Sequence, residues 1–393
     1  MLLMNKRFTI DGSDALEQRL DSLCREVGDK VRQIIPAAKL KGLVLGGGYG
    51  RGEGGVLKTG NGDEPYNDLE FYVFLRGNRL LNQRRYRRAL GDLADQLSLN
   101  AGIHIEFKCD SIQRLKCSPV SMFTYDLIAG HHIICGEPNI FQDCQHHLDA
   151  SAIPLSEATR LLFNRCSGLL LVREKLSRTA SRPGSQRRLS GEDADFIGRN
   201  LAKTQLALGD AVLAVCGEYH WSSGERNRRL MQLSLSEAPP DFSEIKKHHS
   251  AGLAFKLHPC RSSALADEFD ALHRELSHLS SRLWLWLESI RLQEPFLTAR
   301  DYSLYRSNKC PESAAWRNFL LNLKTFGFKA LHDALAWRYP RERLFNALPL
   351  LLWDTETPPE PGLQRLLQKQ LHTAASDWAG WVAAYKNLWP SYG

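Results

Sequence analysis

The sequence predicts an α+β protein with two domains, a mixture of strands and helices in residues 1–150 and helices alone in residues 151–393. Segments with the composition of strands occur only in the first 110 residues, where they alternate with helical segments. Beyond about residue 120 the strand signals vanish and helical periodicity remains. A chain of 393 residues is long enough for two or three domains, so this change of pattern indicates a domain boundary.

The composition excludes a mainly disordered chain and a membrane-spanning one. Apolar residues make up 43% and charged residues 24%, the proportions of a soluble globular protein. No apolar stretch approaches the roughly 18 residues of a membrane span, and no signal-peptide core precedes Lys6, so we expect a cytoplasmic protein without membrane contact. The net charge of +7 permits an anionic partner such as a nucleotide or RNA without requiring one.

Cysteine and histidine do not indicate a metal site. Nine cysteines are spread along the chain without any C-x-x-C pair, a pattern that predicts reduced, mostly buried thiols. A metal cluster of Cys144 with His146 and His147 is the weaker alternative. His131 and His132 are expected in a helix, as capped or core histidines rather than ligands.

The first expected helix covers residues 15–35, where apolar residues recur at steps of three and four, with Ser13 as its cap. Residues 43–45 then form a short apolar strand that leads into the turn 46–55. Seven of the ten residues of this turn are glycine. Such a run indicates a special backbone rather than an ordinary helix or strand.

Four segments complete the first domain. A polar loop is expected over residues 59–67. The aromatic and branched residues of 68–75 predict a strand, and residues 103–107 predict another. Between them, residues 79–97 predict an amphipathic helix that carries several arginines.

The second domain is predicted to be entirely helical. Polar segments with proline and glycine, residues 177–192 and 355–362, separate some of its helices. The helices expected from apolar periodicity are 155–176, 193–216, 264–292, 314–337 and 363–388.

Three acidic residues of the first domain are candidate metal ligands. Side chains alternate along a strand, so Asp68 and Glu70 project to the same face. Two adjacent carboxylates repel each other unless cations lie between them, and Mg²⁺ bound by carboxylates and substrate phosphates is the expected solution. Glu106, on the strand 103–107, would complete a site for two ions if that strand pairs beside the first.

The glycine-rich turn is the candidate phosphate-binding element. Glycine lets backbone N–H groups approach a polyphosphate closely, so a triphosphate would fit between this turn and the acidic residues. Arg51, inside the turn, would either add positive charge to the phosphates or be an ordinary solvated arginine.

Together these features resemble the nucleotidyltransferase superfamily that shares the polymerase-β-like fold. The family's pattern is an apolar strand, a Gly-Ser or Gly-Gly pair, a short helix, a strand with Asp-x-Asp or Asp-x-Glu, and a third acid on a neighbouring strand. Residues 125–138 also look like the helix and turn that close this domain in bacterial relatives. The matching residues are the strand 43–45, Gly47 and Gly48, Asp68 and Glu70, and Glu106.

The resemblance implies transfer of a nucleoside monophosphate from a nucleoside triphosphate to a hydroxyl group, with release of pyrophosphate. Asp68 and Glu70 would hold the Mg²⁺ or Mn²⁺ that binds the phosphates. Glu106 would bind a second metal ion and take the proton from the acceptor hydroxyl. The backbone amides of Gly47 and Gly48 would hold the terminal phosphates.

The acceptor and the oligomeric state stay open, since a small molecule, RNA or a protein would each supply a hydroxyl. In related enzymes the helical part often closes over the nucleotide. Lys203, on a helix of the second domain, is the candidate that would reach the phosphates from there.

An inactive nucleotide-binding regulatory or interaction protein is the main alternative. The spacing from Gly48 to Asp68 is longer than the family's usual one, and Glu70 and Glu106 stand where the family has aspartate. Either departure would fit an altered metal geometry or a loss of catalysis.

Other interpretations explain less of the sequence. Residues 50–55 satisfy the dinucleotide-binding pattern G-x-G-x-x-G, but the parallel βα units that should follow are missing. Asp68 and Glu70 would also suit a solvated strand face, and Asp110 is a rival for the role of Glu106. A third hypothesis, an RNA-binding helical module, rests on basic residues that would equally suit a solvated surface. Arg187 and Arg188, in the loop 177–192, would touch the RNA, whereas Arg226, Arg228 and Arg229 are, like Lys203, positions that would meet a nucleotide.

Overall fold

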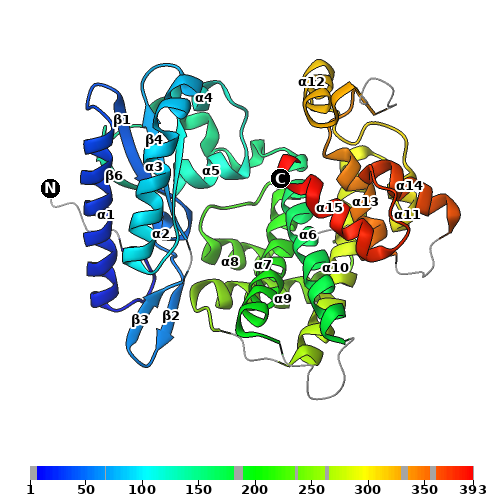
Figure 1. Ribbon diagram of the computed structural model, residues 1–393. Helices are drawn as coiled ribbons and strands as arrows, with labels where there is room; N and C mark the ends of the chain where they lie inside the picture. Colours follow the sequence, from blue (N-terminus) through cyan, green and yellow to red (C-terminus); the bar gives the residue numbers. More distant parts are fainter. Residues whose placement is uncertain are drawn as a thin grey trace. The chain divides into compact units, whose positions relative to one another are not determined.

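The computed structural model confirms an α+β protein. A mixed four-stranded sheet with helices forms the amino-terminal part, and a largely helical region follows it (Figure 1). None of the helices in the described part of the chain is long and apolar enough to cross a membrane. The structure describes residues 7–66, 68–180, 189–234, 238–261, 265–328, 335–354 and 360–392.

Contacts within the chain divide it into two compact units. The first unit comprises Met1–Glu157, Leu213–Leu233 and Ser250–Cys260. The second unit comprises Ala158–Val212, Ser234–His249 and Arg261–Gly393. The sequence predicts a single boundary at residue 150, whereas the chain leaves the first unit after Glu157 and returns to it twice.

The sheet of the first unit has the strand order β5-β4-β1-β6. β1 pairs in antiparallel fashion with β4 and β6, and β4 pairs in parallel with β5. The strand bounds are Leu40–Leu45 for β1, Leu69–Leu75 for β4, Ile105–Asp110 for β5 and His132–Gly136 for β6.

β6 corrects two predictions. Strand signals were expected to end near residue 120, and His131 and His132 were expected in a helix. Instead His132 opens β6, where it pairs with Leu45, and His131 immediately precedes the strand. The segment is a short apolar run, and the periodicity of so few residues does not distinguish a helix from a strand. Its conformation as a strand is set by pairing with β1.

The two faces of the sheet bury different side chains. One face, with Leu43 and Phe71, packs into a core with α1 (Asp14–Ile34) and α3 (Arg79–Ala101). On the other face, Val44, Tyr72 and Phe74 form a second core with two short helices. These helices are α4 (Ile112–Cys117) and α5 (Met122–Ala129).

A hairpin occupies most of the expected polar loop 59–67. β2 (Val56–Thr59) pairs with β3 (Gly62–Pro65), so the prediction of an irregular loop is wrong there. β3 has the sequence GDEP, which lacks the apolar alternation that predicts a strand. The hairpin accounts for the long spacing between the glycine-rich turn and Asp68, and Asn67 lies outside the described residues.

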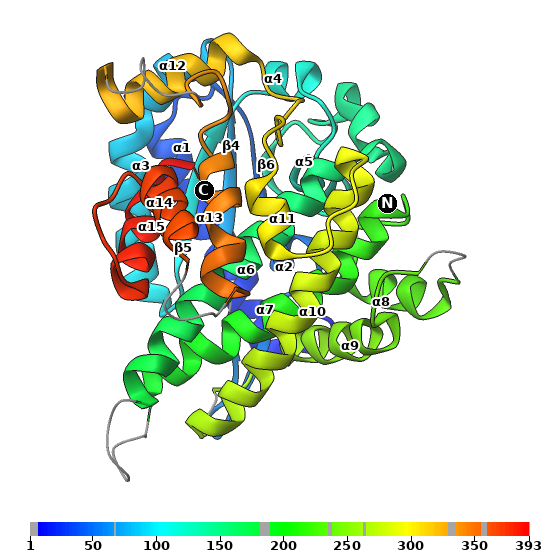
Figure 2. The same ribbon diagram turned by 90° about the vertical axis from the view of Figure 1, so that its right-hand side faces the viewer.

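Three predicted helices are confirmed with small shifts of their ends. They are α6 (Leu155–Ala180), α7 (Gly191–Val215) and α10 (Ala266–Leu292). Figure 2 shows these three long helices side by side in the second unit, where Lys175 on α6 meets Asp193 on α7 and Thr159 on α6 bonds to Glu288 on α10.

Other helical predictions are only partly right. The expected helix 363–388 is two helices, α14 (Pro361–Leu371) and α15 (Trp378–Tyr392), and the expected helix 314–337 contains α12 (Ala315–Phe326). Residues 181–188, 329–334 and 355–359, which fall within predicted breaks or helices, lie outside the described residues. The remaining short elements are α2 (Gly47–Arg51), η1 (Gln142–Leu148), η2 (Ala150–Ala152), α8 (Ser223–Gln232), α9 (Phe242–Leu257), α11 (Ala299–Leu304) and α13 (Glu342–Leu352).

Candidate functional site

The glycine-rich turn meets the acidic strand because β1 and β4 are antiparallel. The end of β1 therefore lies beside the start of β4, where the backbone N–H of Gly46 donates to the carbonyl of Glu70 over 2.9 Å. Gly47 follows with a φ of +63°. A Cβ atom at Gly47 would lie 3.3 Å from Oε2 of Glu70. The turn and the carboxylate are thus immediate neighbours.

Not every glycine of the turn serves a ligand. A Cβ atom at Gly50 would lie 2.2 Å from the carbonyl oxygen of Leu45, a distance that no side chain tolerates. Gly50 is therefore required for close packing of α2 against β1. The Tyr49 hydroxyl donates to the carbonyl of Gly55 over 2.8 Å and fixes the far side of the turn.

Replacing Gly47 by alanine is expected to destabilise the first unit by about 1 kcal/mol, because a left-handed backbone disfavours any Cβ atom. Gly60→Ala is the matched control, since a Cβ atom at Gly60 would meet nothing within 4 Å. Urea unfolding of the two variants measures the difference. Equal stabilities would contradict the strain assigned to Gly47.

Glu70 and Glu106 lie opposite each other on neighbouring parallel strands. Side chains alternate along β4 and β5, so these two carboxylates share a face with Tyr72 and Lys108. The Tyr72 hydroxyl donates to Oε2 of Glu70 over 3.0 Å. The structure thus brings two of the three predicted acids together.

Lys108, which the sequence analysis did not single out, links the two carboxylates. Its Nζ lies 3.4 Å from Oε1 of Glu70 and 3.0 Å from Oε2 of Glu106. Burial lowers the pKa of Lys108, but the nearby Glu70 and Glu106 raise it more strongly, so the net shift is upward and the ammonium is charged at neutral pH. The sequence could have predicted this position, because Lys108 follows Glu106 by two residues and side chains two apart on a strand share a face.

Asp68 is exposed and precedes the first residue of β4. Within the described ranges, no group of three or more His, Cys, Asp or Glu side chains is arranged to hold a metal ion. The three predicted ligands are therefore not gathered into one ready site. The ammonium of Lys108 pairs with both Glu70 and Glu106 instead. Cys144, His146 and His147 likewise do not form such a group, and the nine cysteines are all free thiols.

Asp110, the alternative to Glu106, forms an ion pair with Arg114. Its register partner on β4 is Phe74, four residues along the strand from Glu70. The Nε of Arg114 donates to Oδ1 of Asp110 over 2.7 Å. This ion pair at the other end of β5 separates Asp110 from the pair of glutamates.

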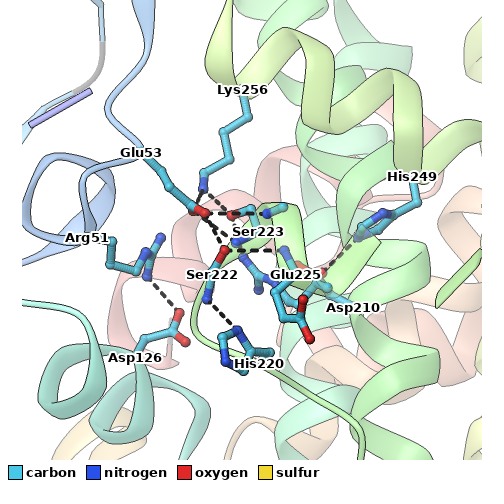
Figure 3. A network of polar contacts seen from close by, with 12 residues as sticks. Arg51, Glu53, Asp126, Asp210, His220, Ser222, Ser223, Glu225, His249 and Lys256 are labelled. Carbon is cyan, nitrogen blue, oxygen red and sulfur yellow. Dashed lines mark hydrogen bonds and ion pairs between the residues drawn. The ribbon is translucent and has the colours of Figure 1, made fainter. Parts of the chain in front are cut away.

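Arg51 is largely buried and forms an ion pair within the first unit. Its side chain is 12% exposed, and its Nη1 donates to Oδ2 of Asp126 on α5 over 2.8 Å (Figure 3). The Tyr219 hydroxyl donates to the same carboxylate oxygen over 3.2 Å. The prediction of a solvated arginine is therefore wrong, whereas the role of phosphate ligand stays a prediction.

Glu53 is a buried acid with several bonding partners, and the sequence analysis missed it. It is 5% exposed and accepts hydrogen bonds from the Ser222 hydroxyl over 2.6 Å and from the Ser223 N–H over 2.9 Å (Figure 3). Lys256 on α9 lies 3.2 Å from Oε2 of Glu53. Burial opposes ionisation of Glu53, but Lys256 and the two hydrogen bonds lower its pKa to about 2.

Two basic side chains, Lys256 and Arg226, lie with Glu53 at the first turn of α8. Arg226 is 4% exposed and donates to the hydroxyl of Ser223 over 2.8 Å. Burial, aided by the nearby charge of Arg51, lowers the pKa of Lys256 to about 8. Glu53 thus supplies a negative charge beside Lys256, and the contact ties the glycine-rich turn to α8 and α9.

The other basic residues that the sequence predicts to contact a ligand lie in both units. Arg228 and Arg229 on α8 form ion pairs with Glu225 rather than an open basic surface. Lys203 is exposed on α7, in the second unit. Its proposed contact with a nucleotide stays a prediction. Arg187 and Arg188 lie outside the described residues.

Comparison with known proteins does not assign the chain to a family. No protein-family model matches the chain, and no curated protein or solved structure matches it either.

Proposed function

We propose that the first unit is a metal-dependent nucleotidyltransferase domain of the polymerase-β-like kind, which transfers a nucleoside monophosphate from a nucleoside triphosphate to a hydroxyl group. One observation carries the proposal. The glycine-rich turn at the end of β1 adjoins Glu70, and Glu106 lies opposite Glu70 in the parallel register of β4 and β5. A phosphate-binding backbone and two carboxylates thereby share one face of the sheet.

The residues present fit a divalent metal ion once Lys108 withdraws. Carboxylate oxygens are the ligands that Mg²⁺ and Mn²⁺ prefer, and Glu70 and Glu106 supply them from neighbouring strands. Asp68, exposed just before β4, is the third candidate ligand. The Lys108 side chain is long and 39% exposed, so it can leave the pair without disturbing the strand. A bound metal ion would neutralise the charge of the triphosphate during transfer.

In this mechanism the chain's own groups bind, orient and accept a proton. The backbone of Gly47 and Gly48 holds the terminal phosphates. Glu106 accepts the proton of the acceptor hydroxyl, whose oxygen forms a new bond to the α-phosphorus. The bond from the α-phosphorus to the bridging oxygen breaks, and pyrophosphate leaves with the bonding electron pair.

The ammonium of Lys108 favours a second candidate function, an inactive nucleotide-binding regulatory protein. It already balances the two glutamates, as a metal ion would in an active enzyme. Such a protein would bind a nucleoside triphosphate through the turn but would release no pyrophosphate.

Calorimetric titration with each nucleoside triphosphate tests the proposal directly. We expect binding in the presence of Mg²⁺ or Mn²⁺ that EDTA abolishes and that Asp68→Ala weakens. Asp92→Asn is the control, because Asp92 is an exposed carboxylate on α3, the helix that packs on the opposite face of the sheet. A nucleotide affinity that neither EDTA nor Asp68→Ala changes would overturn the metal-dependent function.

Replacing Lys108 by methionine is expected to tighten binding of Mn²⁺ about tenfold, since the competing ammonium is removed from between Glu70 and Glu106. Electron paramagnetic resonance of free Mn²⁺ measures the affinity. Lys58→Met is the matched control, because Lys58 pairs with a carboxylate elsewhere in the first unit. Unchanged Mn²⁺ affinity in Lys108→Met would place the metal away from this pair.

A further inference from the structure

β5 is an edge strand with a partly open outer edge. The N–H of Leu69 on β4 donates to the carbonyl of His104 over 2.9 Å. Backbone polar groups of successive residues point to opposite sides of a strand. Ile105, Phe107 and Cys109 therefore direct their N–H and C=O groups away from β4, toward the edge.

Helix α3 closes this edge at both ends and leaves its centre open. Oγ of Ser98 accepts the N–H of Ile105 over 2.9 Å, and Nε2 of Gln83 donates to the carbonyl of Cys109 over 3.1 Å. Phe107 lies between them, and in the described part of the chain no side chain bonds to its N–H or C=O. An open centre between two capped ends is suited to a short added strand.

A groove of about 1030 Å³ runs along this edge, within the first unit. Residues of β5 line one side and residues of α3 line the other. Arg84 and Arg87 on α3 are exposed in the groove and form no ion pair within the described ranges. Leu80, which is 71% exposed, and Phe123, which is 41% exposed, add apolar surface.

The charge along the groove favours an acidic ligand at its centre. Of the acidic residues that line it, Asp110 pairs with Arg79 and Arg114, and Glu106 pairs with Lys108, which Glu70 shares. Asp95 lines the part formed by the last turns of α3. The positive charges of Arg84 and Arg87 are thus unbalanced beside the open centre of β5.

We propose that this groove binds an extended acidic segment of another protein, which adds to β5 as a strand. The backbone of the segment would pair with the N–H and C=O of Phe107, and its acidic side chains would meet Arg84 and Arg87. Backbone pairing supplies affinity in such complexes, and the side chains supply specificity. The inference does not rest on the proposed nucleotidyltransferase activity, although Glu106 and Lys108 line the groove as well as the candidate site.

Fluorescence anisotropy with a fluorescein-labelled peptide Glu-Val-Glu-Val-Glu-Val tests the proposal. We expect Arg84→Glu with Arg87→Glu to weaken binding about tenfold or more. Arg85→Glu with Arg88→Glu is the matched control, since both arginines are exposed on α3 but do not line the groove, and it should retain binding. A peptide N-methylated at its central amides should bind at least about tenfold more weakly, because it cannot pair as a strand.

Hydrogen exchange supplies a readout that charge alone would not change. The amide of Phe107 should exchange more slowly in the complex with the acidic peptide. Undetectable peptide binding, or equal binding of the N-methylated peptide, would overturn the proposal. Displacement of the peptide by a ten-nucleotide oligouridylate, if it also depends on Arg84 and Arg87, would overturn the proposal too, because it would identify a nucleic-acid surface instead.

Discussion

Replacing Glu53 by alanine is expected to lower the free energy of unfolding of the first unit by about 3–5 kcal/mol, the usual cost of removing one partner from a buried ion pair. Glu53 is 5% exposed, and its carboxylate accepts hydrogen bonds from Ser222 and Ser223 and an ion pair from Lys256. Without it, the ammonium of Lys256 stays buried beside Arg226 and Arg51, and it loses the carboxylate with which it pairs in the described part of the chain.

Hydrogen exchange of the amides of β1 and β4 in increasing urea is the appropriate measurement, because it follows the first unit separately from the helices of the second. Glu137→Ala is the control. Glu137 also forms ion pairs, with Arg76 and Lys41, but its side chain is 45% exposed and water replaces its partners. Equal effects of the two substitutions would show that Glu53 is not a structural anchor.

The same carboxylate should make stability depend on pH in the acid range. The folded pKa of Glu53, about 2, lies below its ordinary value of 4.5. Its ionisation therefore contributes stability above pH 4.5, about 3 kcal/mol by the size of the shift, and this contribution is lost as the pH falls toward 2. Glu53→Gln should flatten this part of the stability curve, and an unchanged curve would contradict the assignment.

The position of Glu53 shows where sequence analysis stops. Its partners Ser222 and Lys256 are far along the chain, in segments that return to the first unit after the helices α6 and α7. No local pattern links a glutamate in a glycine-rich turn to a serine 169 positions away. The ion pair of Arg51 is missed for the same reason, since its partner Asp126 lies 75 positions away.

Local patterns, by contrast, predict the acidic face well. Alternation along a strand needs only the neighbouring residues, so it places Glu70 on one face of β4 and Glu106 on the matching face of β5. The register that sets them opposite each other depends on tertiary pairing and is visible only in the structure. β6 and the hairpin of β2 and β3 are missed because their sequences lack the apolar alternation on which strand prediction depends.

Glu70→Gln and Glu106→Gln are each expected to reduce pyrophosphate release about a thousandfold, because each removes a negative charge from the face that must bind the metal ion and, at Glu106, the base that takes the acceptor proton. Glutamine keeps the size of the side chain, so circular dichroism and urea unfolding should show an intact fold. The assay supplies small alcohols and sugars, RNA and protein in turn as acceptors, with Asp92→Asn as the control. Turnover lost in both variants, with nucleotide binding retained in Glu106→Gln, would assign Glu106 to the proton transfer. A fully active Glu70→Gln protein would remove the acidic face from the mechanism.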